Sequence, residues 1–414
     1  METDRRRAGL HREFTQSIGG EKMDRNKKRW VSPSDGVFVY SGRIDREDEE
    51  MPMFVQVCSF FRFRTNSRSG VIVISNRHNY YENALGILVD GEYRGKIVLH
   101  DGENSVGEKV SQYLLRLEPA SIAVLSGELL KKDADARVYD LGLFLDGKMH
   151  EITVFKRMDA CHCFTFCGLV LEESARLEPG SELPAKRIEI YGDSVSCGEV
   201  SEALGRCGLS DPEGHNGIYS NSFYSYGWIL ARKIGAQLHN VSQGGIALRD
   251  GEGYFGGTNA LGMLSCFDKI QYEPVFGEIK QWDFSKYTPH VVILAIGQND
   301  ACPENYMAED YGGKKALEWR QDYRSLIGML RKRYPAARIV LTTTILEHDA
   351  AWDRAIDQVQ REIGDPKVYH FLYSQNGCGT SGHIRISEAE KMAKELKRFL
   401  DSLGEDIWES GNAS

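Results

Sequence analysis

One serine hydroxyl in the sequence is placed as a nucleophile would be. Ser194 lies in Lys186–Gly198 (KRIEIYGDSVSCG), where an alternating apolar run leads into Gly192, Asp193 and a series of small residues. Such a run is typical of a buried strand that turns sharply into a helix, with Gly192 and Asp193 supporting the turn, and this geometry raises one hydroxyl above the end of a sheet. A hydroxyl presented in this way can attack an acyl carbon. The triplet alone is also compatible with a helix cap, in which Asp193 or Ser194 accepts a backbone N–H.

Three later stretches carry the other groups that such a nucleophile needs. Asn240–Gly245 (NVSQGG) follows a short predicted strand, Gly297–Asp300 (GQND) follows the apolar run Val291–Ile296, and His383 stands shortly before the last predicted helix. Histidine is the most frequent general base, and amide N–H groups stabilise the negative charge that develops on an attacked carbonyl. Each stretch also has a plain structural interpretation: a glycine turn, a helix cap and a loop histidine.

Taken in this order, the four blocks resemble the SGNH (GDSL-type) hydrolases. The resemblance implies a serine esterase in which Ser194 is the nucleophile and His383 the base. It also implies an oxyanion hole made by the backbone N–H groups of Ser194 and Gly245 and by the side-chain amide of Asn299. We expect no cofactor and no metal ion.

A narrower resemblance, to carbohydrate esterase family 2, covers nearly the whole chain. It depends on short blocks spread over the sequence: Ser41–Ile44 (SGRI), His150–Arg157 (HEITVFKR), Gly168–Leu171 (GLVL), Ser225–Gly227 (SYG) with Ala231-Arg232, and Asn376–Cys378 (NGC). Members of that family are acetyl esterases with an N-terminal jelly roll and an SGNH catalytic domain. The resemblance implies removal of acetyl groups from acetylated plant-type oligosaccharides of the xylo-, manno- or gluco- type, through an acyl-enzyme.

The acidic residue that usually orients the base is missing from its expected place. Many SGNH enzymes carry an aspartate three residues before the histidine and some family 2 members carry it two before, whereas Thr380 and Ser381 stand there in this chain. Some family 2 esterases use a Ser-His dyad that main-chain carbonyls orient, and the resemblance implies the same arrangement for His383. The Trp and Pro that usually flank the base are replaced by Gly382 and Ile384.

Other functions remain open. An SGNH esterase or thioesterase for lipid-like acyl chains would need an apolar groove, but Glu199–Asn216, after the nucleophile turn, is polar and rich in glycine. Acetyl transfer to sugar acceptors is a second alternative, and a catalytically silent glycan-binding protein, suggested by the missing acid, is a third. Aromatic residue type alone makes four side chains candidates for a sugar-stacking platform: Trp282, Tyr254, Phe255 and Trp352. A place in the core or at a rim is the alternative for each of them, and the one that residue type favours.

The elements that must position these groups are predicted to form two domains, because 414 residues exceed one ordinary core. Residues 1–30 are predicted to be a flexible tail. Residues 31–180 show short β-like runs between turn signals, which favours an all-β sandwich or jelly roll. After Pro179-Gly180, residues 181–414 alternate strands with helices, so we predict an α/β, SGNH-type three-layer domain with a parallel sheet and functional loops at its carboxyl edge.

The expected elements are as follows. Strands of the first domain are predicted at Val37–Tyr40, Phe54–Phe63, Val71–Ser75, Ala84–Val89, Lys96–Leu99, Val110–Leu117 and Glu151–Phe155. Strands of the second are predicted near 187–192, 237–242, 290–296, 338–344 and 367–372, and helices near 222–235, 316–333 and 386–402.

Composition narrows the function classes. With 41% hydrophobic residues, 27% charged residues and a formal net charge of -9, the chain has the make-up of a globular protein and not of one that binds nucleic acid. It contains no apolar run of membrane-spanning length, and its N-terminal stretch lacks the apolar segment of a secretory signal. We therefore expect a cytoplasmic protein without a membrane partner, and the oligomeric state is left open.

Cysteine usage favours reduced thiols. The nine cysteines are odd in number and irregularly spaced, unlike a disulfide framework. Cys161, His162, Cys163 and Cys167 could suggest a zinc site. Strand alternation places the three cysteines on one face and His162 on the other, so a buried strand is the better interpretation.

Overall fold

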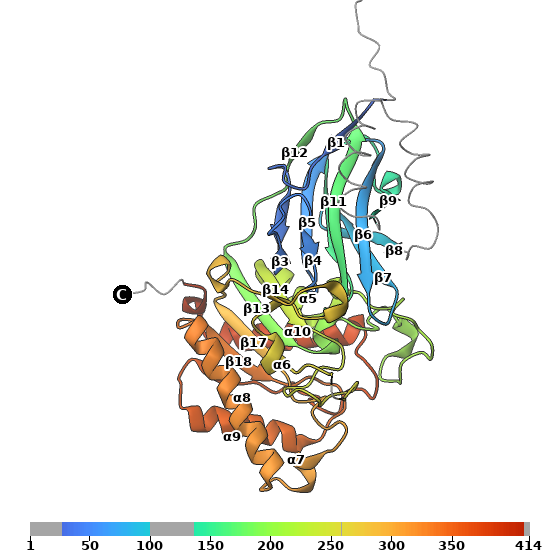
Figure 1. Cartoon of the computed structure of the whole chain (residues 1–414). Helices are drawn as coiled ribbons and strands as arrows, with labels where there is room; N and C mark the ends of the chain where they lie inside the picture. The colour runs from blue at the N-terminus through green and yellow to red at the C-terminus, as the bar shows by residue number, and fades with distance from the viewer. Residues whose placement is uncertain (1–26, 100–135, 258, 410–414) are drawn as a thin grey trace, which may run out of the picture.

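The computed structural model describes residues 27–99, 136–257 and 259–409. They form an antiparallel β-sandwich that stands on one end of an α/β domain (Figure 1). The predicted architecture, an α/β domain with a parallel sheet preceded by an all-β region, is confirmed. The predicted strand Val110–Leu117 lies outside the described residues.

The sandwich consists of two six-stranded sheets. One has the order β3 (Ile44–Asp45), β4 (Met53–Phe54), β11 (His162–Glu172), β6 (Gly70–His78) and β9 (Ala136–Asp140), with β1 (Lys28–Val31) paired to β11. The other has the order β12 (Leu177–Pro179), β5 (Phe60–Thr65), β10 (His150–Lys156), β7 (Asn83–Val89) and β8 (Glu92–Leu99), with β2 (Val39–Ser41) paired to β5. Alternate side chains of the two sheets interdigitate in the core, where the rings of Phe61 and Phe166 stack with centroids 4.0 Å apart.

Two predicted boundaries in this domain differ from the structure. The single strand predicted at Phe54–Phe63 is broken, because β4 ends at Phe54 and β5 begins at Phe60. Between them, Cys58 has a positive φ of 65° and packs in the apolar cluster shared with the α/β domain. The chain therefore bends here to contact its neighbouring domain. Strand β1 also begins at Lys28, inside the segment predicted as a tail.

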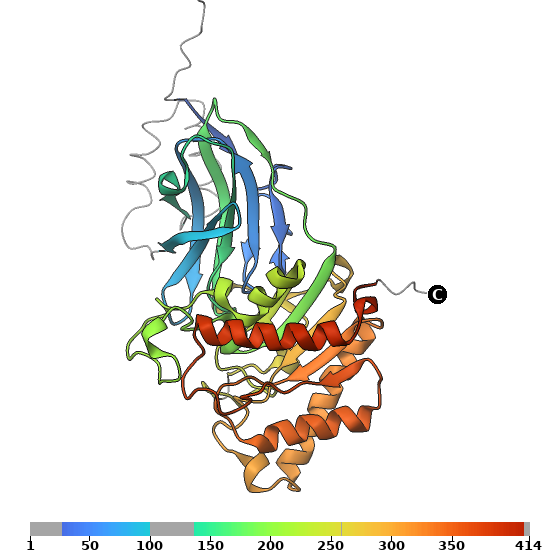
Figure 2. The same ribbon diagram turned by 180° about the vertical axis from the view of Figure 1, so that it is seen from behind.

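The α/β domain has one parallel sheet covered on both faces. Its order is β14 (Ala236–Ser242), β13 (Lys186–Gly192), β17 (Val291–Ala295), β18 (Arg338–Thr342) and β19 (Val368–His370). Helices α5 (Tyr226–Ile234) and α10 (Ile386–Ser402) cover one face, and α8 (Lys314–Arg333) and α9 (Ala350–Ile363) cover the other (Figures 1 and 2). Burial on both faces explains why strands such as β17 are apolar throughout.

All five predicted strands and all three predicted helices of this domain are present. Helix α9 was not predicted, although it buries a stripe of four side chains: Trp352, Ala355, Ile356 and Val359. The remaining short elements lie in the connecting loops: α4 (Ser194–Cys197), α6 (Met263–Cys266), α7 (Tyr306–Glu309), β15 (Lys269–Gln271) and β16 (Lys280–Gln281).

Buried charged side chains join the two domains. Arg43, from the SGRI block of the sandwich, is fully buried, and its guanidinium lies 3.0 Å from the Glu189 carboxylate and 2.6 Å from the Tyr191 hydroxyl on β13. Arg157, from the HEITVFKR block, lies 2.7 Å from the Glu202 carboxylate in the loop after α4. Breaking a buried pair of this kind leaves an uncompensated charge, which costs about 3–5 kcal/mol. These pairs hold the sandwich against the loops that follow the parallel strands.

In the described ranges, no helix is both long enough and apolar enough to cross a membrane. The same residues contain no group of three or more His, Cys, Asp and Glu side chains that could hold a metal ion. In the segment that had suggested zinc, Cys161, Cys163 and Cys167 are buried thiols, and Nδ1 of His162 lies 2.7 Å from the Asp159 carboxylate.

Candidate active site

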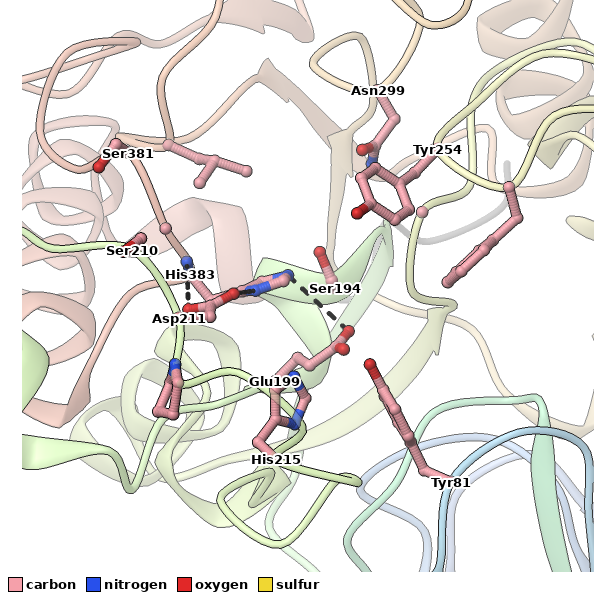
Figure 3. Close-up of a pocket in the computed structure, with 15 residues that line it drawn as sticks. Tyr81, Ser194, Glu199, Ser210, Asp211, His215, Tyr254, Asn299, Ser381 and His383 are labelled. Atoms are coloured by element: carbon pink, nitrogen blue, oxygen red, sulfur yellow. Dashed lines mark hydrogen bonds and ion pairs between the residues drawn. The ribbon is translucent and has the colours of Figure 1, made fainter.

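The four residues predicted to carry the chemistry line one pocket of about 380 Å³. Ser194 and Gly245 follow the ends of β13 and β14, Asn299 follows β17, and His383 precedes α10. The carboxyl ends of parallel strands lie along one edge of a sheet, which explains why residues so far apart in sequence converge (Figure 3). The structure thus brings together every predicted member of the site.

A tight turn presents the Ser194 hydroxyl. Asp193 is the N-cap of α4, and its carboxylate accepts the Val195 N–H at 3.0 Å, so the helix-cap interpretation is correct for Asp193. At Gly192, a Cβ atom would lie 2.2 Å from Oγ of Ser196, so only glycine allows the strand and the helix to approach this closely. The cap leaves the Ser194 side chain directed into the pocket (Figure 3).

The two predicted oxyanion donors lie beside this turn. Gly245 has a φ of 70°, a conformation that favours glycine, and its carbonyl accepts the Tyr254 N–H at 2.9 Å. Nδ2 of Asn299 donates to the Asp193 carboxylate at 3.1 Å and to the Ile246 carbonyl at 3.2 Å. Both amide hydrogens of Asn299 therefore have protein acceptors in this state. An oxyanion would have to displace one of these acceptors to receive a hydrogen bond from Asn299. Such donors often reach their catalytic geometry only when substrate is bound.

The sandwich domain holds the turn that carries Gly245. Asp159, in the loop between β10 and β11, is buried, and its carboxylate accepts the Gly244 N–H at 2.8 Å and the Tyr80 hydroxyl at 2.7 Å. Burial raises the pKa of this carboxyl, but the bonded His162 and nearby positive charge outweigh burial and lower the pKa to about 2. An ionised Asp159 is therefore a fixed acceptor for the N–H next to Gly245.

A carboxylate from a distant segment orients the histidine. Nδ1 of His383 lies 2.6 Å from Oδ2 of Asp211, whose Oδ1 accepts the His383 N–H at 3.1 Å and a guanidinium N–H of Arg385 at 2.9 Å. Burial alone would raise the pKa of Asp211, but its bonds and attraction to His383 and Arg385 hold the pKa below its usual value. The prediction that main-chain carbonyls orient His383 in a Ser-His dyad is therefore wrong, because Asp211 occupies that position.

Gly382, which stands where the family usually has a larger residue beside the base, packs against the segment that carries Asp211. A Cβ atom on Gly382 would lie 2.6 Å from the Leu209 carbonyl oxygen and 2.9 Å from the Asp211 backbone nitrogen. A large residue before His383 would therefore displace the segment that carries Asp211. Only the missing acid at Thr380 and Ser381 hinted at a substitute, and no local pattern around Asp211 could have identified it.

A second carboxyl group, also missed from the sequence, faces the other ring nitrogen. Oε2 of Glu199 lies 3.8 Å from Nε2 of His383, on the side of the imidazole opposite Asp211 (Figure 3). Burial raises the pKa of Glu199 to about 7, against the lowering effect of His383. Burial lowers the pKa of His383, but the negative charges of Glu199 and Asp211 outweigh burial and raise it above its usual value.

Aromatic side chains form the rim of the pocket, although not all of those predicted. Tyr254 and Phe255 are 71% and 56% exposed and line the pocket together with Tyr81. The two tryptophans proposed for a sugar platform are buried, with exposures of 7% for Trp282 and 0% for Trp352. Both indoles pack in apolar clusters away from the pocket, so the core interpretation applies to these two candidates.

Comparisons with known proteins agree with this geometry. Residues 188–403 match the family described as GDSL-like Lipase/Acylhydrolase. The acetylxylan esterase / glucomannan deacetylase of Cellvibrio japonicus is 27% identical over 271 residues, which cover 64% of this chain and 71% of that protein. The cellulase/esterase CelE of Acetivibrio thermocellus is 29% identical over 258 residues, which cover 60% of this chain and 29% of that longer protein.

Solved structures share the two-domain fold. A family two carbohydrate esterase from Cellvibrio japonicus has a TM-score of 0.69 at 21% identity, with 92% of this chain and 98% of that chain covered. A family two carbohydrate esterase from Clostridium thermocellum, in complex with cellohexaose, has a TM-score of 0.66 at 22% identity, with 90% of this chain and 100% of that chain covered. The resemblance predicted from the sequence blocks is confirmed.

Proposed function

Because this chain belongs to the GDSL-like lipase/acylhydrolase family and is a serine ester hydrolase, we propose that it removes acetyl groups from acetylated plant-type oligosaccharides of the xylo-, manno- or gluco- type. The observation that carries the proposal is the meeting, in one pocket, of the Ser194 hydroxyl with His383 and the Asp211 carboxylate bonded to it. The acetylated sugar is inferred from the relatives, whose names describe deacetylation of xylan and glucomannan.

In the first half of the reaction, Ser194 becomes acetylated. Its hydroxyl attacks the ester carbon while Nε2 of His383 takes the hydroxyl proton, and Asp211 holds the Nδ1–H and stabilises the imidazolium. The N–H groups of Ser194 and Gly245 and the amide of Asn299 stabilise the oxyanion, each contributing about 3–4 kcal/mol. His383 then gives its proton to the departing sugar oxygen as the carbon–oxygen bond breaks.

In the second half, water releases acetate. His383 removes a proton from a water molecule, which attacks the acetyl group on Ser194, and the same donors stabilise the second oxyanion. When the intermediate collapses, His383 returns the proton to the serine oxygen. The sugar hydroxyl and acetate are the two products.

The pocket gives less support to two of the three alternatives, the esterase for lipid-like acyl chains and the silent glycan-binding protein. Leu346 is the only Leu, Ile, Val or Met side chain among the described residues that line it, whereas a long acyl chain needs a continuous apolar groove. The silent glycan-binding protein was suggested by the missing acid, and Asp211 occupies that place.

The test is release of acetate from acetylated xylo-, manno- and gluco-oligosaccharides, compared with hydrolysis of a longer-chain ester. We expect acetate from the sugar esters, little hydrolysis of the longer chain, and loss of both activities in Ser194→Ala. Ser325→Ala, which changes an exposed serine on α8, serves as the matched control. Acetate release that survives Ser194→Ala, or a strong preference for the longer chain, would contradict the proposal.

A further inference from the structure

Glu199 brings into the pocket a carboxyl group for which the reaction has no use. Its backbone N–H donates to the Ser194 carbonyl at 3.1 Å, so the residue is anchored to the nucleophile turn. Its side chain is only 14% exposed and lines the same pocket as Ser194. Figure 3 shows the carboxyl group directed towards the space between Ser194 and His383.

The Glu199 carboxylate lacks the donors that normally accompany a buried charge. Asp211 is bonded to His383 and Arg385, and Asp159 is bonded to several donors, including the Gly244 N–H. Within the described part of the chain, no group donates a hydrogen bond to Glu199, and its one ion-pair contact is Nε2 of His383 at 3.8 Å. The carboxylate faces the pocket without a protein donor, so it is free to accept a hydrogen bond from a donor on a bound molecule.

The position of Glu199 identifies which part of the substrate it meets. Nε2 of His383 must reach the departing alcohol oxygen to protonate it. Glu199 lies 3.8 Å from that nitrogen, so an alcohol oxygen that reaches Nε2 would bring the carbon atoms bonded next to it close to the Glu199 carboxylate.

The charge of the pocket restricts the sugar further. No Lys or Arg is among the described residues that line it. The titratable groups whose charges act on Glu199 are His383, Asp159, Asp211 and Asp193, and Tyr80 and Tyr81 face it from the sandwich. The groups in the pocket that can carry positive charge are therefore His383 and His215. Burial lowers the pKa of His215, which favours its neutral form, and His383 is neutral when it acts as the base.

We infer that Glu199 selects the alcohol part of the substrate. It accepts a hydrogen bond from a hydroxyl or protonated amine next to the ester, and it rejects an alcohol that carries a carboxylate there. This inference depends on the proposed esterase function and specifies its substrate class: acetyl esters of neutral or amino sugars, and not of uronic acids. Aromatic rings at Tyr81, Tyr254 and Phe255 line the same pocket and suit the apolar face of such a sugar.

A matched substrate pair tests the inference. Methyl glucoside and methyl glucuronoside, each acetylated at O4, differ only in whether C5, the carbon next to the esterified C4, carries a hydroxymethyl or a carboxylate group. We expect wild-type enzyme to favour the glucoside in kcat/KM by at least about tenfold, because two carboxylates in a partly desolvated pocket repel each other. In Glu199→Gln this ratio should fall by about tenfold, whereas Glu213→Gln, an exposed carboxyl in the same segment, should leave it unchanged.

The pH dependence of the ratio is a second readout. Because the pKa of Glu199 is raised to about 7, the wild-type preference for the glucoside should increase from pH 6 to pH 8.5 as this carboxyl ionises. The titration of His383 affects both substrates equally and cancels in the ratio. A ratio that is unaffected by Glu199→Gln, in an enzyme that hydrolyses the glucoside ester, overturns the inference alone. Absence of acetate release from every ester would overturn the proposed function, and this inference with it.

Discussion

His383 and Asp211 are separated by 172 positions in the sequence, yet Nδ1 of the imidazole lies 2.6 Å from Oδ2 of the carboxylate. This contact fixes the proton on Nδ1 and leaves the lone pair of Nε2 directed towards the Ser194 side of the pocket (Figure 3). The segment after the nucleophile turn therefore supplies what the segment before His383 lacks.

Replacing Asp211 by Asn should lower kcat by about 10⁴-fold with little change in KM, because an amide holds the imidazole in the wrong tautomer. Steady-state kinetics on an acetylated xylo-oligosaccharide would measure this loss. Glu213→Gln removes a carboxyl from the same segment and should retain activity. If Thr380→Ala lowered kcat as far as Asp211→Asn, the orientation of His383 would have to be assigned to a different group.

Gly382→Ala should impair catalysis through Asp211. The added Cβ would lie 2.6 Å from the Leu209 carbonyl oxygen, so the loop that carries the acid must move. Displacements of about 1 Å in catalytic groups can cost about 10²-fold, and we expect a loss of at least about tenfold in kcat. Gly312→Ala is the matched control, because nothing lies within 4 Å of a Cβ at that position. Equal activity of the two variants would show that the close approach at Gly382 is unimportant.

Asp159→Asn should lower kcat more than it changes KM. One oxygen of Asp159 contacts His162 and the other accepts the Gly244 N–H. An asparagine has only one side-chain oxygen, so its NH₂ group would have to face one of these two donors. The oxyanion turn then loosens, and its stabilisation matters in the transition state more than in binding. Tyr80→Phe removes only one donor to Asp159 and should have a smaller effect on kcat.

For Asp159→Asn, kcat and KM should be measured separately, and the stability of the variant should be measured by urea unfolding. A fall in kcat of about ten- to a hundredfold at nearly constant KM would fit the weakening of one oxyanion donor, whose complete loss costs about 10²–10³-fold. A variant that is destabilised but has wild-type kcat would show that the contact serves only folding.

The pH–rate profile should reveal the two carboxyl groups around His383. The base is the neutral imidazole, so kcat/KM should rise with pH as His383 loses its proton, and the raised pKa of His383 places this rise at higher pH than for an unperturbed histidine. Glu199→Gln removes one of the charges that favour the imidazolium. The acid limb of the pH–rate profile of this variant should therefore move to lower pH. An unchanged acid limb, or a shift to higher pH, would show that the Glu199 charge does not raise the pKa of His383.

The positions of Ser194, Gly245, Asn299 and His383 could be predicted because each lies next to an element with a strong local signal. The strands before the first three are largely buried and parallel, and their ends must share one edge of the sheet. Asp211 could not be predicted in the same way, because its loop has no periodicity and is placed by tertiary contacts such as that with Gly382.

The remaining differences between the sequence-based expectations and the structure arise from burial of side chains. Trp282 and Trp352 have the residue type of a sugar platform, but their indoles fill apolar clusters, and sequence alone does not distinguish a buried aromatic ring from an exposed one. The bend between Phe54 and Phe60 arises because Cys58 packs against the neighbouring domain, a contact that the strand pattern does not encode.

The central claim is that Ser194 forms an acetyl-enzyme during hydrolysis of a sugar ester. The most direct measurement is rapid acid quench of the enzyme during turnover of an acetylated xylo-oligosaccharide, followed by peptide mass spectrometry. The account predicts an acetyl group on Ser194 in the wild-type enzyme, in higher yield in Asp211→Asn if release of acetate slows more than its attachment, and none in Ser194→Ala. An acetyl group on another residue, or turnover without any acetylated peptide in either active form, would contradict it.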